Sequence, residues 1–186
     1  RMEELLFRKT YLYTENELCF SGLPRYDFLS DRKNDSKIKN IFFMPTWRSY
    51  IKNITDFDRS VYFKSIHSLL NNTNLNQILE HHNYQLNFLI HPNFSKFTQK
   101  FSDLQSKNIK ILSHENCNIG ELIEKCYFAI TDYSSVVFDV AFLKKPILYY
   151  QFVKKDFRSG HYEKSKYFSY EEHAQGAVVD NEKDLI

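Results

Sequence analysis

Short, unbroken apolar runs separated by longer amphipathic stretches dominate the pattern of this chain. The runs have strand length and no polar alternation, which is typical of strands buried on both faces of a sheet. They cover residues 41–44, 84–90, 109–112, 127–130 and 146–150. Helical periodicity fills the gaps, at 56–83 with a break near 71–73, and at 94–104, 119–126 and 136–145. This strand–helix alternation predicts an α/β fold with a parallel, doubly wound, Rossmann-like sheet.

The two ends of the chain depart from this pattern. Residues 1–17 predict a helix end or connector, residues 18–27 a short strand running into a turn, and residues 30–40 a polar, hinge-like loop. Beyond residue 150 a long aperiodic segment precedes a short strand at 177–179 and the start of a helix at 181–185. We therefore divide the chain into a lead-in, 1–38, and a folded domain, 39–186. Because the chain starts with Arg1, we expect it to be a piece of a longer protein.

Composition excludes several classes of protein. With 25 Lys and Arg against 23 Asp and Glu, the net charge of +2 gives no case for nucleic-acid binding. His81 and His82 are adjacent on a predicted helix, point about 100° apart and make a poor metal pair. No apolar run approaches the ~20 residues of a membrane span. An odd number of cysteines without metal-ligand spacing indicates free thiols in a reducing compartment. These are Cys19, Cys117 and Cys126.

Polar and aromatic side chains follow the first two predicted strands. The carboxyl ends of parallel strands form the edge at which open α/β sheets bind ligands. Thr46, Trp47 and Arg48 follow the first strand, and His91 follows the second. For Arg48 we expect either a clamp on phosphate oxygens or a surface salt bridge. For Trp47 we expect either stacking on a base or sealing of the core edge. His91 is a general acid–base candidate, since imidazole titrates near neutral pH, or a structural histidine.

A turn of small polar residues follows the strand at 127–130. Its members are Thr131, Asp132, Tyr133, Ser134 and Ser135. Hydroxyls and unpaired N–H groups at a helix start offer a seat for a phosphate or pyrophosphate. The alternative is an ordinary capped helix.

Three further candidates lie later in the chain. Asp139, about one turn into the helix, meets a ribose hydroxyl or braces the turn. Arg158 and His161 lie in the long loop after residue 150, across a Ser-Gly pair that lets the backbone approach a ligand closely. No carboxylate cluster suggests Mg²⁺, so we predict chemistry without a metal or a bound cofactor.

Five motifs occur in an order that is similar to one family. They are Pro-Thr-Trp-Arg at 45–48, His-Pro at 91–92, Thr-Asp-Tyr-Ser-Ser-Val-Val-Phe-Asp at 131–139, Lys-Pro-Ile-Leu-Tyr-Tyr at 145–150 and Phe-Arg-Ser-Gly-His-Tyr at 157–162. Over residues 18–180 the chain resembles the CDP-glycerol glycerophosphotransferases, the teichoic acid and capsule polymerases of bacteria. One departure is Val153, where family members often carry an acidic residue.

The resemblance implies a glycosyltransferase-B (GT-B) architecture of two Rossmann-like domains. Residues 39–186 would be the nucleotide-binding half, and the amino-terminal acceptor domain, with a further catalytic histidine, would lie outside this chain. The donor would be CDP-glycerol, or CDP-ribitol as in some members. The acceptor would be a growing polyol-phosphate chain at the cytoplasmic face of the bacterial membrane, which implies peripheral membrane contact.

The resemblance also implies roles for single residues. An acceptor hydroxyl would attack the phosphorus that carries the polyol, and CMP would leave. Ser134 and Ser135 would hold the pyrophosphate, Arg48 and Arg158 would neutralise charge on its oxygens, and His161 would help bind it. His91 would act as acid–base or as donor to the leaving phosphate.

Three alternatives to this reaction stay open. The same fold serves nucleotide-sugar glycosyltransferases, because fold does not fix chemistry. The second alternative is a binding module that binds nucleotide without turnover. The third is a scaffold piece in a cell-wall assembly complex.

Overall fold

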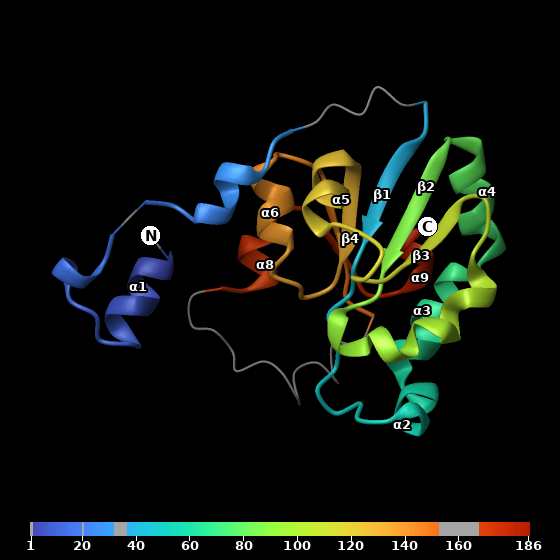
Figure 1. Ribbon diagram of the computed structural model, residues 1–186, viewed down its shortest axis with the longest axis horizontal. Coiled ribbons are helices and arrows are strands. Elements are labelled where there is room, and N and C mark those ends of the chain that lie inside the picture. Colours follow the sequence, from blue (N-terminus) through green and yellow to red (C-terminus); the bar gives the residue numbers. More distant parts are fainter. Residues whose placement is uncertain (1, 20, 32–36, 153–167) are drawn as a thin grey trace.

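The computed structural model describes residues 2–19, 21–31, 37–152 and 168–186. Within them six strands form one parallel sheet in the order β3-β2-β1-β4-β5-β6 (Figure 1). The strands are β1 Lys39–Phe43, β2 Tyr84–Leu89, β3 Ile109–Leu112, β4 Cys126–Thr131, β5 Ile147–Tyr150 and β6 Ala177–Val179. The first strand, β1, lies in the middle of the sheet, β2 and β3 follow on one side of it, and β4, β5 and β6 follow on the other. This order is that of a doubly wound Rossmann-like domain, so the predicted α/β class is confirmed.

Helices cover both faces of the sheet (Figure 1). One face carries α2 Ile54–Arg59, α3 Val61–Leu70, α4 Thr73–His81, the 3₁₀ helix η3 Pro92–Leu104 and α9 Glu182–Leu185. The other face carries α5 Ile119–Lys125, α6 Val137–Phe142 and α8 Tyr170–His173. Neighbouring residues of one strand therefore enter two different cores. Ile41 and Phe43 of β1 pack under the first set, and Phe42 under the second, which explains the unbroken apolar runs in the sequence.

Polar residues divide the predicted helix 56–83 into three. The hydroxyl of Ser60 accepts a hydrogen bond from the Phe63 N–H at 3.0 Å and starts α3. The Asn72 side chain accepts from the Leu75 N–H at 3.2 Å and starts α4, at the break expected near 71–73. Short polar side chains thus set these boundaries by satisfying the N–H groups that a helix start leaves unpaired.

The predicted helix 136–145 is shorter than its sequence pattern. α6 ends at Phe142, and Lys144 takes a φ of 56° in the left-handed region. Lys145 therefore does not stabilise a last helical turn. Its ammonium group instead donates to the carbonyls of Glu124 and Cys126, at 2.7 Å each.

The lead-in contains α1 Met2–Lys9 and the 3₁₀ helices η1 Glu15–Glu17 and η2 Pro24–Phe28. The short strand expected within 18–27 was wrong, since the described residues there form no strand. Near its end the lead-in packs on α5 and α6. The Tyr26 ring stacks on Phe142 with centroids 4.2 Å apart, and the Ser30 N–H donates to the buried Glu124 carboxylate at 2.8 Å. The division at residue 38 stays a prediction. Across the described ranges, every helix is too short or too polar to cross a membrane.

Candidate active site

The carboxyl ends of three neighbouring strands bring predicted site segments together. β1 lies between β2 and β4, so the segments that follow these strands meet at one edge (Figure 1). We call this edge the rim; it consists of residues 44–50, 90–93 and 132–136. The rings of Trp47 and His91 have centroids 6.1 Å apart, and the N–H of Thr46 donates to Asp132 at 2.7 Å. Residues far apart in the chain therefore contact one another at the rim.

Asp132 joins the segment after β1 to the segment after β4. Its Oδ1 accepts the N–H groups of Thr46, at 2.7 Å, and Tyr133, at 2.6 Å. Its Oδ2 accepts Nη2 of Arg48 at 2.8 Å. Only 1% of the Asp132 surface is exposed, and both carboxylate oxygens accept hydrogen bonds from the protein itself. In this conformation Asp132 therefore positions the rim.

Arg48 is buried, with none of its surface exposed. Nη1 donates to the Thr46 carbonyl at 2.5 Å, and Nη2 pairs with Asp132. The guanidinium carbon lies 5.3 Å from the centroid of the Tyr62 ring and 5.8 Å from that of Tyr133. The prediction of a phosphate clamp at Arg48 therefore does not fit this conformation, and neither does a surface salt bridge. The Arg48 guanidinium binds the Asp132 carboxylate, where the prediction had a phosphate, and the rings of Tyr62 and Tyr133 shield the pair from water.

The turn after β4 differs from the capped helix start that its composition predicts. Thr131 is buried and donates its hydroxyl to the Met44 carbonyl at 2.9 Å, so it fastens β4 to β1. The N-cap of α6 is Val136, without a side-chain capping bond. Ser134 is half-buried and Ser135 exposed. Among the described residues no hydrogen bond engages the backbone N–H groups of these two serines, which leaves both donors available at the rim.

His91 follows β2 and caps η3. Its Nδ1 accepts the N–H of Asn93 at 3.2 Å, so the neutral imidazole holds its proton on Nε2. Trp47 lies against one side of the ring and packs edge-on to Phe94, with centroids 6.4 Å apart. The half-buried His91 is thus oriented by its own turn and by Trp47 as an Nε2–H donor.

Asp139 of α6 contacts the lead-in. Its carboxylate pairs with Nε of Arg25 in the lead-in at 2.7 Å, and this hydrogen bond raises the pKa of Arg25. Both side chains line an open groove between η2 and α5, together with Asn118. In the structure Asp139 therefore bonds to the lead-in, and the ribose contact or brace of the turn stays a prediction.

Arg158 and His161 lie within 153–167, outside the described residues. Their roles stay predictions.

Sequence reasoning missed Tyr62. The helical pattern at 56–83 did not single it out, but the structure buries Tyr62 and leaves 49% of Val61 exposed. The i, i+4, i+7, i+8 spacing of Tyr62 with Ile66, Leu69 and Leu70 was the signal that would have placed Tyr62 on the inner face of α3.

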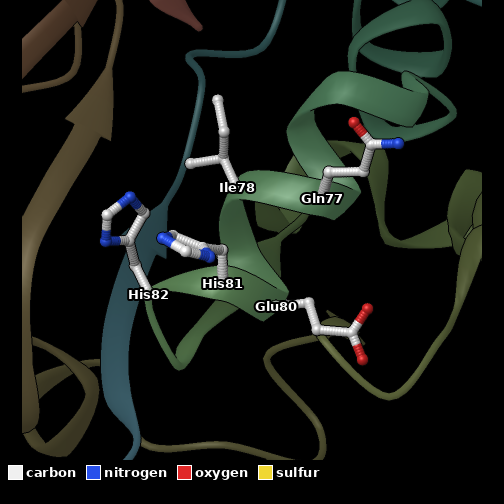
Figure 2. A pocket seen from close by; sticks show the side chains of 5 residues that line it. All are labelled: Gln77, Ile78, Glu80, His81 and His82. Atoms are coloured by element: carbon white, nitrogen blue, oxygen red, sulfur yellow. The ribbon is translucent and has the colours of Figure 1, made fainter.

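A second concavity lies at the opposite edge of the sheet, where α4 leads into β2. Figure 2 shows the five side chains that line it, which are Gln77, Ile78, Glu80, His81 and His82. The two imidazoles meet edge to face with centroids 4.7 Å apart and lie on the surface. No group of three or more His, Cys, Asp or Glu side chains in the described ranges could hold a metal ion. This concavity lacks the convergent strand ends of the rim.

The fold defines a Rossmann-like domain whose predicted site segments meet at its strand ends, and comparison with known proteins gives its family. The family model for CDP-glycerol:poly(glycerophosphate) glycerophosphotransferase matches residues 1–186, and the chain belongs to this family. It is 30% identical over 192 residues to the minor teichoic acid biosynthesis protein GgaB of Bacillus subtilis (strain 168), covering 97% of this chain and 20% of GgaB.

Other relatives agree. The chain is 30% identical over 197 residues to the teichoic acid poly(glycerol phosphate) polymerase of the same strain, covering 97% of this chain and 24% of that protein. Two structures of the wall teichoic acid polymerase TagF superimpose with TM-scores of 0.69 and 0.72 at 24% identity, covering 99% and 100% of this chain and 45% of TagF. The chain thus spans less than half of each of these proteins.

Proposed function

We propose that the rim holds the diphosphate of CDP-glycerol and that this chain supplies the donor-nucleotide half of a glycerophosphotransferase. Family membership supports the reaction class. The observation that carries the assignment to the rim is the bonding of Asp132, which ties the motif at 45–48 to the motif at 131–139. Ligands of open α/β sheets bind at such strand ends.

The reaction is a phosphoryl transfer. The oxygen of an acceptor hydroxyl attacks the phosphorus that carries glycerol, the bond from this phosphorus to the CMP oxygen breaks, and CMP leaves with the electron pair. The hydroxyl proton passes to a base on the acceptor side. Catalysis of this kind depends on positioning and on stabilising charge.

Residues of the rim divide between ligand contact and support. The N–H groups of Ser134 and Ser135 bind the diphosphate oxygens, and Nε2–H of His91 donates to the leaving phosphate. Thr46, Trp47 and Tyr133 line the nucleotide.

The remaining predicted residues support or complete this site. Thr131 and Asp132 hold the loops in place, and Arg48 does so in the free protein. Arg158 and His161, from the fifth family-like motif, add positive charge to the same phosphates.

The wider protein has the GT-B architecture implied by the family resemblance. Residues 39–186 form its nucleotide-binding domain and residues 1–38 the connection to an acceptor domain. The match covers 45% of TagF, which supports the view that this chain corresponds to about half of such a protein. A polyol-phosphate chain is the acceptor, no metal or cofactor takes part, and the protein works at the inner face of the bacterial membrane.

Nucleotide titration of the full-length protein tests this proposal. CDP and CDP-glycerol should raise the melting temperature, and CDP-glycerol should release CMP. One TagF structure was determined after a 15-minute soak with CDPG, which supports CDP-glycerol as the first donor to try. A larger rise in melting temperature with CDP-ribitol or a UDP-sugar would indicate that this compound, and not CDP-glycerol, is the donor. Binding without turnover would leave a nucleotide-binding module, and no binding by any nucleotide would overturn the proposal.

A further inference from the structure

Tyr62 carries a buried hydroxyl that makes no hydrogen bond to the described residues. The side chain lies in the first turn of α3 with none of its surface exposed. A buried hydroxyl without a partner costs about 1–3 kcal/mol, so such groups are rare and each needs an explanation.

The surroundings of Tyr62 indicate the explanation. The Arg48 guanidinium lies over its ring at 5.3 Å, and the ring packs edge-on to Phe94, with centroids 5.2 Å apart. Burial raises the pKa of Tyr62, and the nearby charge of Asp132 raises it further. The hydroxyl therefore keeps its proton at neutral pH and can serve as a donor.

One oxygen of the Asp132 carboxylate depends on Arg48 for its hydrogen bond. Its Oδ1 accepts two backbone N–H groups, whereas Oδ2 accepts the charged Nη2 of Arg48. If Arg48 left, Oδ2 would be a buried carboxylate oxygen without its counter-charge, which is costly. A replacement donor must already be buried beside the pair. The Tyr62 hydroxyl is buried, and its ring lies 5.3 Å from the guanidinium that Asp132 holds at 2.8 Å.

We propose that Tyr62 is a positioning residue that takes over Asp132 when Arg48 turns from it to the diphosphate of the bound nucleotide. The exchange keeps the rim loops joined through Asp132 while it frees the guanidinium for the ligand. This inference rests on the proposed function, because it requires a diphosphate at the rim. It also explains why the free protein tolerates an unpaired hydroxyl: the bond forms only in the bound state.

The experiment measures melting temperature and CDP affinity of the full-length protein and its Tyr62→Phe variant. Without the unpaired hydroxyl, the free variant should melt at the same temperature as wild type or higher. Its affinity for CDP should fall about tenfold, the effect of one hydrogen bond to a charged group. In the Asp132→Asn background the same change should alter affinity much less, since the charged acceptor is gone.

Tyr149→Phe is the matched control. Tyr149 is equally buried but lies in the other core, and its hydroxyl already donates to Gln175 at 2.6 Å. Its variant should melt lower and bind CDP like wild type. If wild type binds CDP and Tyr62→Phe binds it within twofold, the exchange is wrong while the proposed function stands. If wild type itself binds no CDP, the proposed function has failed instead.

Discussion

Arg48 and Asp132 form an ion pair, 2.8 Å from Nη2 to Oδ2, in which the side chains are 0% and 1% exposed. The partners are 84 residues apart and come from the ends of two neighbouring strands. Burying both charges is costly, and the pair is tolerable because Asp132 also accepts two N–H groups while Arg48 also donates to a carbonyl. In the free protein the rim is thus held together by a pair of opposite charges that bind each other.

Removing one partner of this pair should destabilise the protein strongly. Asp132→Asn leaves the guanidinium buried without a counter-charge, and we expect the free energy of unfolding to fall by about 3–5 kcal/mol. Arg48→Met together with Asp132→Asn should lose clearly less than the sum of the two single variants. Denaturant titration gives these values. Arg25→Ala is the control, because the Arg25–Asp139 pair has one side chain 52% exposed and should be worth about 0–1 kcal/mol. Loss of under about 1 kcal/mol in Asp132→Asn would contradict the buried-pair account.

His91 should separate folding from turnover through two conservative variants. Asn at this position retains an oxygen that can accept the Asn93 N–H but loses the Nε2 donor. Gln places an amide donor near the Nε2 position but gives up the cap. We expect His91→Asn to melt like wild type with kcat lowered about 10²–10⁴-fold. His91→Gln should melt lower and retain more activity. The reverse order of activities would remove the donor role from His91.

Much of this fold follows from the sequence, whereas the partners at the rim do not. Five of the six strands come from apolar runs, because a parallel sheet covered on both faces needs no polar alternation. Local pattern cannot tell whether Arg48 meets a phosphate or a carboxylate, since both occupy the same strand ends. It also cannot show that Asp139 pairs with Arg25, 114 residues earlier. Both pairings join segments that only the tertiary fold brings together, the ends of β1 and β4 in one case and η2 and α6 in the other. The missed burial of Tyr62 was different, since its signal, the helical spacing with Ile66 and Leu69, is local.

Glu124 should hold the lead-in on the domain. Its buried carboxylate accepts the N–H and the hydroxyl of Ser30 at 2.8 and 3.1 Å. We expect Glu124→Ala to speed hydrogen exchange of residues 24–31 and to cost about 1–3 kcal/mol of stability. Glu121→Ala is the control, because Glu121 is exposed and pairs with Lys125 within the same helix. Equal exchange in both variants would show that this contact does not fasten the lead-in.

Alkaline pH should destabilise the protein through Cys126. Burial raises the pKa of its thiol from 9.0 to about 11. Between these values the unfolded chain loses a proton that the folded protein retains, so this thiol lowers the free energy of unfolding by about 1.4 kcal/mol per pH unit. The stabilisation is complete below pH 9.0 and lost as pH rises through about 11. Denaturant titrations at pH 8, 9, 10 and 11 would measure the loss, which should be smaller in Cys126→Ala whatever its stability at neutral pH.

The central claim is that three strand ends form one seat for the diphosphate of the donor. A crystal structure of the full-length protein with CDP-glycerol tests it most directly. We expect the diphosphate within about 3 Å of the Ser134 and Ser135 N–H groups, with His91 Nε2 facing the leaving phosphate. A nucleotide bound at the opposite edge, in the concavity of His81 and His82 (Figure 2), would contradict the account.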